Sequence, residues 1–482
     1  MSLGLRRSAS RAPGPSGALD RLTTLAAVGV GAYMSALGGS IVNSILPVIT
    51  RAFESDVAQI EWVITAYLLV QGGLLLSFGR LGDLRGHKSI YVWGFVAFLT
   101  GSALCGLAPS LGFLVGARAF QAVGAAMLIA SSPAILTHTF PPAQRGRVLG
   151  IQSTTVYLGL ASGPPIGGWL ADTLGWRATF YANLPVGLLA LALSLRFIPP
   201  DAPSGRREPF DLAGAGAYVL GLTVLLLGLS QGHAVGWSSP IVLGCLAAGL
   251  AVLGVFAAIE LRVPSPMLDL GLFRRRALSA PVLSAVLNYL GTSSTFFLVP
   301  FYLIQGRGLS PSQAGLLLTA QPIVMATTAS LSGTLSDRIG SRLPATAGMA
   351  VLGLGLFLLS RLGESTPLGF VAGALAVVGL GIGLFTSPNN SAIMGAVPAQ
   401  RRGVASGVLA TARTLGNVLG VGMAGAIFST VLAGGESAGP GAVVNGVGLG
   451  LLVASVLAFV GALTSATRPG PEPAGERARR GY

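Results

Sequence analysis

The sequence predicts an all-α membrane protein with fourteen transmembrane helices, arranged as two six-helix bundles plus a central helix pair (6+2+6). Composition is the first reason: 52% of the 482 residues are hydrophobic and only 10% are charged, against about a quarter in ordinary soluble proteins. A soluble chain of this length would need a charged exterior, which so few charges cannot build. The second reason is that apolar runs of about 20 residues, the length of a membrane-spanning helix, recur along the chain.

Each predicted helix is a window of about 20 apolar residues that ends at charges, proline or clustered glycine. The windows are 23–47, 60–79, 88–107, 112–137, 147–171, 178–197, 211–230, 240–260, 279–304, 313–334, 344–361, 367–394, 404–432 and 443–465.

The lysines and arginines predict the orientation of these helices. If the N-terminus is cytoplasmic, 24 of the 30 fall in cytoplasmic segments and four, Arg51, Arg177, Arg307 and Arg361, fall in external ones. This bias follows the positive-inside rule, so we expect both termini in the cytoplasm and the chain in the plasma or inner membrane. We expect no nucleic-acid partner, because the basic residues are spread along the chain rather than clustered on one face.

Two stretches, GRLGDLRGHK at 79–88 and GTLSDRIGSR at 333–342, share Gly, Leu, Asp and Gly at matching positions. Each follows the second helix of a predicted block, and their offset of 254 residues exceeds the about 180 to 200 that six helices need, so an extra helix pair separates the blocks. We expect tight turns at the glycines and a charged latch on the cytoplasmic side; a solvated loop is the alternative. The residues concerned are Gly79, Asp83, Arg85, Gly86, Lys88, Gly333, Asp337, Arg338 and Gly340.

These patterns predict five regions along the chain. They are a cytoplasmic N-terminal tail at 1–22, a six-helix bundle at 23–200, a two-helix insert at 201–265, a second six-helix bundle at 266–467 and a cytoplasmic C-terminal tail at 468–482.

The fifth predicted helix carries a glycine-proline pattern. Glycines that recur every three to five positions make a smooth face that lets another helix approach, and paired prolines bend a helix by removing hydrogen bonds. Generic packing of small residues is the alternative, because the chain has 70 glycines. The pattern consists of Gly159, Gly163, Pro164, Pro165, Gly167 and Gly168.

Two arginines fall inside predicted helices. A guanidinium within a span costs at least about 2.5 kcal/mol and must face a partner or a wet cavity. We expect Arg118 and Gln121 to line a central substrate pathway; bonding of Arg118 to helix-end carbonyls is the alternative. For most other polar residues within spans the alternative role is hydrogen bonding between helices. The further residues expected on the pathway are Arg413, Asn43, Asn288, Tyr289 and Asn389.

Several stretches, in order along nearly the whole chain, resemble motifs of the major facilitator superfamily, in particular its fourteen-helix drug:proton antiporters. They are SIVN at 40–43, the stretch at 79–88, RAFQAVG at 118–124, GLASGPPIGG at 159–168 and WRATFYANLPVG at 176–187. The resemblance implies secondary transport by alternating access, with export of amphipathic compounds such as drugs or toxic metabolites, and antibiotic resistance.

The proton-coupling group is the point at which the sequence departs from these antiporters. They carry an aspartate two positions before the residue matching Ser40, where this chain has Gly38. All 16 acidic residues fall at predicted helix ends, loops or tails, whereas a membrane proton carrier normally needs a buried carboxylate or histidine. We therefore expect a site that prefers neutral or anionic substrates over lipophilic cations. Proton coupling would run through Glu61 or Asp83 or through the substrate, and facilitated diffusion without protons is the alternative.

Other classes of function fit the sequence less well. An ATP-driven pump needs Gly-Lys in its phosphate loop, and the sole lysine, Lys88, follows His87. The three histidines, at 87, 138 and 233, lie far apart along the chain, so we expect no enzyme active site, metal or cofactor. A non-transporting sensor would need a soluble output domain, for which no segment is long enough. We expect a monomer with a small-molecule substrate in a lipid bilayer, with residues 201–265 peripheral to the pathway.

Overall fold

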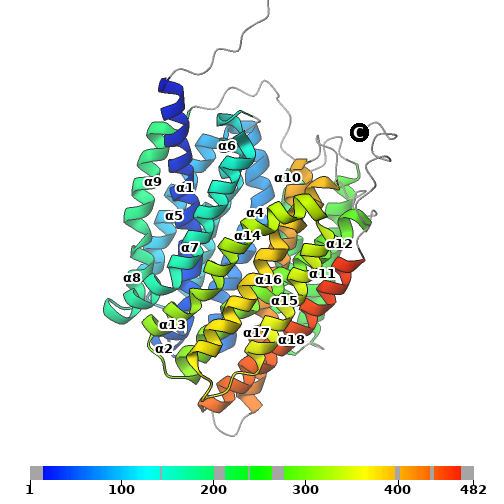
Figure 1. Ribbon diagram of the computed structural model, residues 1–482. Coiled ribbons are helices and arrows are strands. Elements are labelled where there is room, and N and C mark those ends of the chain that lie inside the picture. The colour runs from blue at the N-terminus through cyan, green and yellow to red at the C-terminus, as the bar shows by residue number, and fades with distance from the viewer. Residues whose placement is uncertain are drawn as a thin grey trace, which may run out of the picture.

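The computed structural model of the chain describes residues 15–141, 144–199, 212–236, 239–262, 276–396, 402–434 and 439–467. Within these ranges the regular secondary structure is entirely helical, without a β-strand. In Figure 1 helix α1 (Pro15–Ser44) begins at the upper end of the molecule and runs downward, and α18 (Pro440–Ala466) runs from the lower end upward and ends at the right edge. The start of α1 lies inside the predicted tail 1–22, whereas the predicted tail 468–482 lies outside the described residues.

The helices between residues 15 and 197 pack on one another as a first group. Helix α1 lies against α7 and α9, and α6 lies against α4 and α5. An apolar core that includes Met34, Phe95 and Ile135 lies between them. The bounds are α2 (Leu46–Ala52), α3 (Val57–Ile60), α4 (Trp62–Arg85), α5 (His87–Gly106), α6 (Leu111–Thr139), α7 (Arg145–Thr173), α8 (Trp176–Tyr181) and α9 (Asn183–Phe197).

The helices between residues 276 and 466 form a second group. Helix α12 lies against α17 and α18, and α16 lies against α14 and α15. The Ser294 hydroxyl on α12 donates to the Gly420 carbonyl oxygen of α17 at 3.1 Å. The bounds are α12 (Arg276–Phe301), the π-helical turn η3 (Tyr302–Gly306), α13 (Pro311–Leu318), α14 (Ala320–Ile339), α15 (Arg342–Ser360), α16 (Leu368–Gly395) and α17 (Arg402–Gly434).

Two helices connect the groups. Helix α10 (Leu212–Val235) lies against α4 of the first group and α17 of the second, and α11 (Pro240–Glu260) packs on α10. The Tyr218 hydroxyl of α10 and the Thr411 hydroxyl of α17 are hydrogen bonded at 2.9 Å. Most of α11 is exposed, including Ile241 and Leu250, as expected for a helix that faces lipid.

Twelve helical segments in the described part of the chain are long and apolar enough to cross a membrane. Some combine a short helix with a longer one, as in Val57–Leu75 and Pro311–Ser336. Two further long helices are not among these twelve segments. Helix α7 is less apolar, because glycine, serine and threonine recur along it. Helix α10 contains only the shorter apolar segment Ala213–Leu225. The prediction of an all-helical, multi-span membrane protein is confirmed.

The two repeated stretches are helix ends, not the loops that the sequence predicts. Helix α4 continues through Arg85, and the chain turns at the single residue Gly86, with φ 99°, before α5 begins. Likewise α14 is followed by a turn at Gly340, with φ 82°, before α15. These two glycines adopt a left-handed φ that disfavours other residues, whereas Gly79 and Gly333 lie within helices. The prediction was wrong because charged residues at the water-exposed end of a spanning helix do not end it.

Candidate functional site

The charged start of α5 is bonded to the end of α9. The Lys88 ammonium donates to the carbonyl oxygens of Leu195, at 3.2 Å, and Ile198, at 2.5 Å. Helix carbonyls at a C-terminus lack partners within the helix and attract cations. The side chains of Asp83 and Asp337 lie outside what the structure describes, so the latch role of the repeated stretches stays a prediction.

Two histidines that are distant in sequence lie close together at the same end. The rings of His87 and His138 are 6.0 Å apart, so the sequence separation of the histidines did not reflect their distance in space. Gly82 leaves room for one of them, because a Cβ there would lie 2.6 Å from Cε1 of His87. In the ranges that the structure describes, no group of three or more His, Cys, Asp or Glu could hold a metal ion.

Glycines of α7 bring this helix into backbone contact with α1. A Cβ on Gly159 would lie 2.5 Å from the carbonyl oxygen of Tyr33, and a Cβ on Gly163 would lie 2.6 Å from Cβ of Ser40. A Cβ on Gly167 would meet α1 one turn further along. Gly159, Gly163 and Gly167 therefore lie on one face of α7, and this face packs against α1.

One proline of α7 leaves a hydrogen-bond acceptor that α1 uses. Helix α7 runs unbroken from residue 145 to 173 through Pro164 and Pro165. Because Pro164 has no N–H, the carbonyl oxygen of Leu160 lacks its helical donor. The Ser40 hydroxyl of α1 donates to that oxygen at 2.9 Å.

Gly168 faces the second group of helices, not α1, which corrects the prediction of one shared face. Five positions beyond Gly163 correspond to about 140° around the helix at 3.6 residues per turn. A Cβ on Gly168 would lie 2.7 Å from the carbonyl carbon of Pro311, and one on Gly315 would lie 2.8 Å from the carbonyl carbon of Pro164. Neither helix has room for a side chain here, so α7 and α13 form a tight seam between the groups.

A carboxylate closes the lower end of this seam. Asp172, in the last turn of α7, accepts a hydrogen bond from the backbone N–H of Ser312 at 2.9 Å and another from the Ser312 hydroxyl. Ser312 lies in the first turn of α13, where free N–H groups and the helix dipole favour a negative charge. The bond therefore fastens the two groups together at the end opposite to the start of α1.

A second seam joins α4 to α17. Glu61, between α3 and α4, is 0% exposed, and a Cβ on Gly425 of α17 would overlap its Oε2 and lie 3.2 Å from its Cδ. Further along the pair, a Cβ on Gly72 would lie 2.6 Å from Cβ of Thr414. The two contacts are eleven residues apart on each helix, so the seam is about 16 Å long.

Glu61 lies at a helix end, between α3 and α4, as the sequence predicts, but it is buried rather than exposed to water. From the sequence, Glu61 stands at the start of a predicted helix, where it would meet water. In the structure it lies inside the candidate span Val57–Leu75 and is covered by a helix more than 300 residues away in sequence. Glu260, at the end of α11, is also buried, with 4% exposed.

Arg118 is buried between α4 and α6, with 1% of its surface exposed. Its Nε donates to the carbonyl oxygen of Val63 at 3.3 Å, and one terminal nitrogen donates to Oε1 of Gln121 at 2.6 Å. The guanidinium lies over the ring of Tyr67, 4.0 Å from the centroid. These contacts include a bond to a helix carbonyl, as in the alternative role, and the pathway role of Arg118 stays a prediction.

Three polar side chains from both groups of helices lie within electrostatic range of one another. Tyr289 of α12 interacts electrostatically with Arg413 of α17 and with Tyr157 of α7. Arg413 and Tyr289 are partly exposed, unlike Arg118. Each residue lies well inside its helix, so the cluster, which we call the polar centre, is within the membrane-spanning part of the molecule.

The structure describes the surroundings of three further residues that the sequence predicts on the pathway. The Asn288 side chain is buried and donates to Sδ of Met349 on α15 at 3.5 Å, so it points into the second group. Asn389 of α16 is buried, and Asn43 near the end of α1 is half-buried.

Gly38 lies inside the first group. A Cβ there would stand 3.1 Å from the Phe98 ring and 3.3 Å from Oδ1 of Asn183. The Asn183 amide donates to the Ser102 hydroxyl at 3.1 Å. The position of the antiporter aspartate is therefore packed among polar groups of α5 and α9, away from α17.

Sequence reasoning did not single out Tyr157, Asp172, Gly315 or Gly425. The two glycines had no distinguishing signal among 70. Asp172 is one of the 16 acidic residues in the sequence, but its partner Ser312 lies 140 positions away and no sequence pattern connects the two.

A multi-span helical protein in which two groups of helices meet at tight seams around buried polar side chains is a membrane transport protein. This chain belongs to the Major Facilitator Superfamily, whose model matches residues 28–421 and, in a second match, residues 281–481.

Two relatives and one solved structure illustrate the similarity. The riboflavin transporter RibZ of Clostridioides difficile is 35% identical over 403 residues, which cover 84% of this chain and 87% of RibZ. The multidrug resistance protein Stp of Mycobacterium tuberculosis is 33% identical over 413 residues, covering 86% of this chain and 76% of Stp. The fold matches a crystal structure of a bacterial homologue of the human lysosomal transporter Spinster, in an inward-facing and unoccupied conformation. That match has a TM-score of 0.67 and 16% identity, and covers 95% of this chain and 98% of the other.

Proposed function

We propose that this protein exports small amphipathic compounds by alternating access, with the polar centre as its substrate site. The observation that supports the proposal is that Tyr157, Tyr289 and Arg413 come from both groups of helices and lie within electrostatic range of one another, where α17 packs on Tyr289 at Gly416. If the groups rock against each other about this level, the site opens to one side of the membrane at a time.

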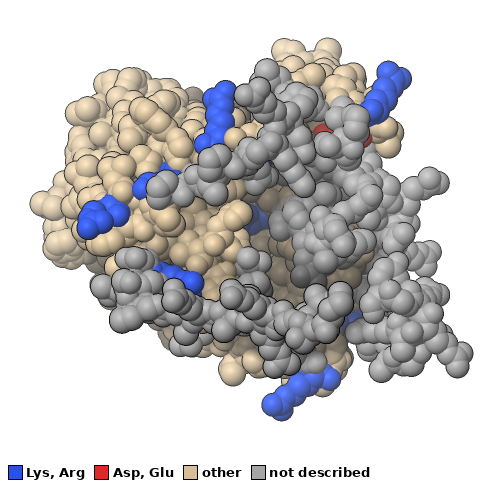
Figure 2. Space-filling model, turned by 90° about the horizontal axis from the view of Figure 1, so that it is seen from above, with Lys and Arg blue, Asp and Glu red and all other residues tan. Residues whose placement is uncertain are grey.

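The proposed layout has fourteen spans, with α7 and α10 added to the twelve apolar segments, as in the fourteen-helix antiporter branch. The regions are two bundles at 23–200 and 266–467 with the insert 201–265 between them. An even number of crossings agrees with the opposite directions of α1 and α18 in Figure 1. Among the residues that Figure 2 does not draw in grey, Lys and Arg are spread around the upper end of the molecule and acidic side chains are visible at the upper right, which favours a cytoplasmic position for this end.

The structure then corresponds to an inward-facing state. With the upper end in the cytoplasm, Asp172 with Ser312 and Glu61 with Gly425 lie toward the outside of the cell and hold that side closed. The solved structure with the same fold is described as inward-facing. Export would require both seams to part.

Charge at the polar centre favours neutral or anionic substrates over lipophilic cations. The Arg413 guanidinium is a permanent cation that stacks on planar groups and binds anionic oxygens. Tyr157 and Tyr289 add phenol rings and hydroxyl groups for an aromatic ligand. Riboflavin, named for one relative, is an uncharged planar molecule with a polar chain and is a suitable first probe.

We propose Glu61 as the proton-coupling group. It is a wholly buried carboxyl inside a candidate span, and it stands at a seam that must open during transport. Carboxyl groups favour the protonated form where water is excluded. In the proposed cycle Glu61 takes up a proton from outside when the seam opens and carries it as the seam closes. Net antiport further requires release of this proton toward the cytoplasm before the seam reopens.

The test is transport by the purified protein in proteoliposomes. We expect wild-type protein to accumulate riboflavin against its gradient when a pH jump is imposed, and to exchange it by counterflow without one. Glu61→Gln should keep counterflow and lose the pH-driven accumulation, whereas Glu364→Gln, at an exposed acid of the same end, should keep both. Proton-driven transport that is undiminished in Glu61→Gln would refute the role of Glu61.

A proton-independent facilitator is the second candidate. The observation that favours it is Gly38, which leaves the position of the antiporter aspartate without a carboxyl, beside Asn183. A facilitator would show counterflow at every pH but no accumulation after a pH jump, in wild type as in Glu61→Gln.

A further inference from the structure

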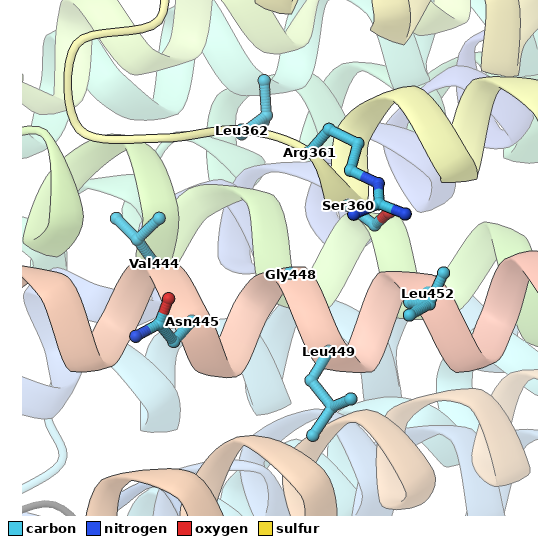
Figure 3. Close-up of a pocket in the computed structure, with 8 residues that line it drawn as sticks. All are labelled: Ser360, Arg361, Leu362, Val444, Asn445, Gly448, Leu449 and Leu452. Carbon is cyan, nitrogen blue, oxygen red and sulfur yellow. The ribbon is translucent and has the colours of Figure 1, made fainter.

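A pocket at the lower end of the second group lies apart from the polar centre and both seams. It lies between the end of α15 and the first turns of α18, and Figure 3 shows Ser360 and Arg361 on one side and the α18 residues along the other. The residues that line it are Ser360, Arg361, Leu362, Val444, Asn445, Gly448, Leu449 and Leu452.

The pocket presents an arginine whose guanidinium is available to a ligand. Arg361 is exposed, and among the described residues the contact of its guanidinium is with the ring of Phe357, 4.8 Å away. Arg307 at the same end differs, because it donates to the carbonyl oxygen of Thr366 at 2.5 Å and to the Tyr302 hydroxyl at 3.2 Å. Arg307 is held by the fold, whereas Arg361 can bind an anion from outside the protein.

The opposite wall combines an amide with apolar side chains on one face of α18. Asn445, Leu449, Leu452 and Val456 are spaced four, three and four residues apart, which places them along one stripe. Asn445, Leu449 and Val456 are exposed. The exposed apolar surface of α18 continues to Leu463, so it runs for about 21 Å from Leu449, longer than half of a bilayer core of about 30 Å.

A glycine sets the width of the pocket floor. A Cβ on Gly448 would lie 3.0 Å from the carbonyl oxygen of Ser360, so the end of α15 rests close to α18. The acidic side chain of Glu364 lies toward Gly441, which precedes Gly448 by seven residues, or about 10 Å, near the start of α18. Arg361 therefore keeps its charge available on the side of the pocket that faces the apolar stripe.

We propose that this pocket binds an anionic phospholipid. The Arg361 guanidinium would bind the phosphate oxygens, the Asn445 amide would donate to the headgroup, and an acyl chain would lie along Leu449, Leu452 and Val456. Arginine matches phosphate geometry with paired N–H donors, and the apolar stripe faces the hydrocarbon in any membrane-inserted state. This site is independent of the transport cycle proposed above.

The experiment measures lipid binding to the full-length protein in detergent by native mass spectrometry. Phosphatidylglycerol and phosphatidylcholine with identical acyl chains are titrated against wild type, Arg361→Gln, Arg361→Lys and Leu452→Trp. We expect phosphatidylglycerol to bind wild type more tightly than phosphatidylcholine and to lose about tenfold in affinity in Arg361→Gln, because a charged hydrogen bond is lost. Arg361→Lys should lose less, and Leu452→Trp should weaken both lipids by filling the pocket.

Arg51→Gln is the matched control, because it removes an exposed arginine of the same charge at the same end of the molecule without touching the pocket. It should bind phosphatidylglycerol as wild type does. Equal affinity in wild type and Arg361→Gln, an equal loss in Arg51→Gln, or equal binding of the two lipids to wild type would overturn the proposal. Competition by inorganic phosphate at comparable concentration would show a phosphate site without lipid selectivity and would also contradict it.

Discussion

Replacing Gly425 with alanine should shift the protein away from the closed state seen here. The new Cβ would overlap Oε2 of Glu61 and stand 3.2 Å from its Cδ, with the Phe297 ring 3.8 Å away on the other side. The overlapped atom is the end of a side chain that is wholly buried, so it cannot turn into water, and we expect part of the shift to fall on α17. Overpacking a well-packed contact costs about 1–3 kcal/mol, and a state in which the seam is open does not bear this cost. The ratio of closed to open molecules should therefore fall by about 5- to 150-fold.

The assay is a distance measurement across the seam in nanodiscs, by spin labels or single-molecule fluorescence. Labels at exposed positions near Asp172 and Glu364 report the separation of the two groups at that end. We expect a larger open population in Gly425→Ala than in wild type. Gly373→Ala is the matched control, because that helical glycine has no atom within 4 Å of a Cβ, and its population should equal that of wild type.

Two double variants separate size from charge. Glu61→Ala removes the overlapped atoms, so Gly425→Ala in that background should have little effect. Glu61→Gln keeps the shape, so the shift should persist there. An unchanged population in Gly425→Ala, or a full shift that survives in the Glu61→Ala background, would refute the steric reasoning.

Asp83→Asn should abolish riboflavin flux while leaving membrane insertion intact; wild-type flux from a well-folded variant would remove the latch role. Asp172→Ala should weaken the α7–α13 seam by about 1 kcal/mol, the loss of hydrogen bonds to the start of a helix. It should therefore raise the open population about fivefold in the same distance assay, and no change would show that the bond does not hold the seam. A cysteine at Leu225 should not be protected from thiol reagents by substrate, because the insert is expected to be peripheral, and protection would contradict this. Gly38→Asp should introduce pH-dependent transport of ethidium, and a variant that transports ethidium no better than wild type would refute the reading of this position.

Helix positions were predictable from the sequence because the bilayer imposes length and polarity on each span. The window 88–107 differs from α5 by one residue at each end, and the window 240–260 coincides with α11. The ends of α4 and α14 were missed because water-exposed turns carry charges without breaking the helix. The positive φ of Gly86 and Gly340, not the charges, marks the true boundary.

The sequence predicted only those features of the candidate site that depend on the residue spacing within a single helix. The face of α7 formed by Gly159 and Gly163 follows from helical spacing alone, and it meets α1. The burial of Glu61 depends on Gly425, a residue from the other half of the chain that no spacing rule connects to it. Arg118 was recognised as unusual, but its bond to the Val63 carbonyl depends on how α4 and α6 pack. Contacts between distant helices require the fold itself.

The most direct test of the central claim is proton-driven flux through the polar centre in proteoliposomes. Wild type should accumulate riboflavin after a pH jump, and it should carry riboflavin and the anionic dye fluorescein faster than the cation ethidium. Arg413→Leu should abolish the preference for fluorescein over ethidium. Absence of flux for all three probes, or transport of ethidium alone with the preference unchanged in Arg413→Leu, would contradict the account.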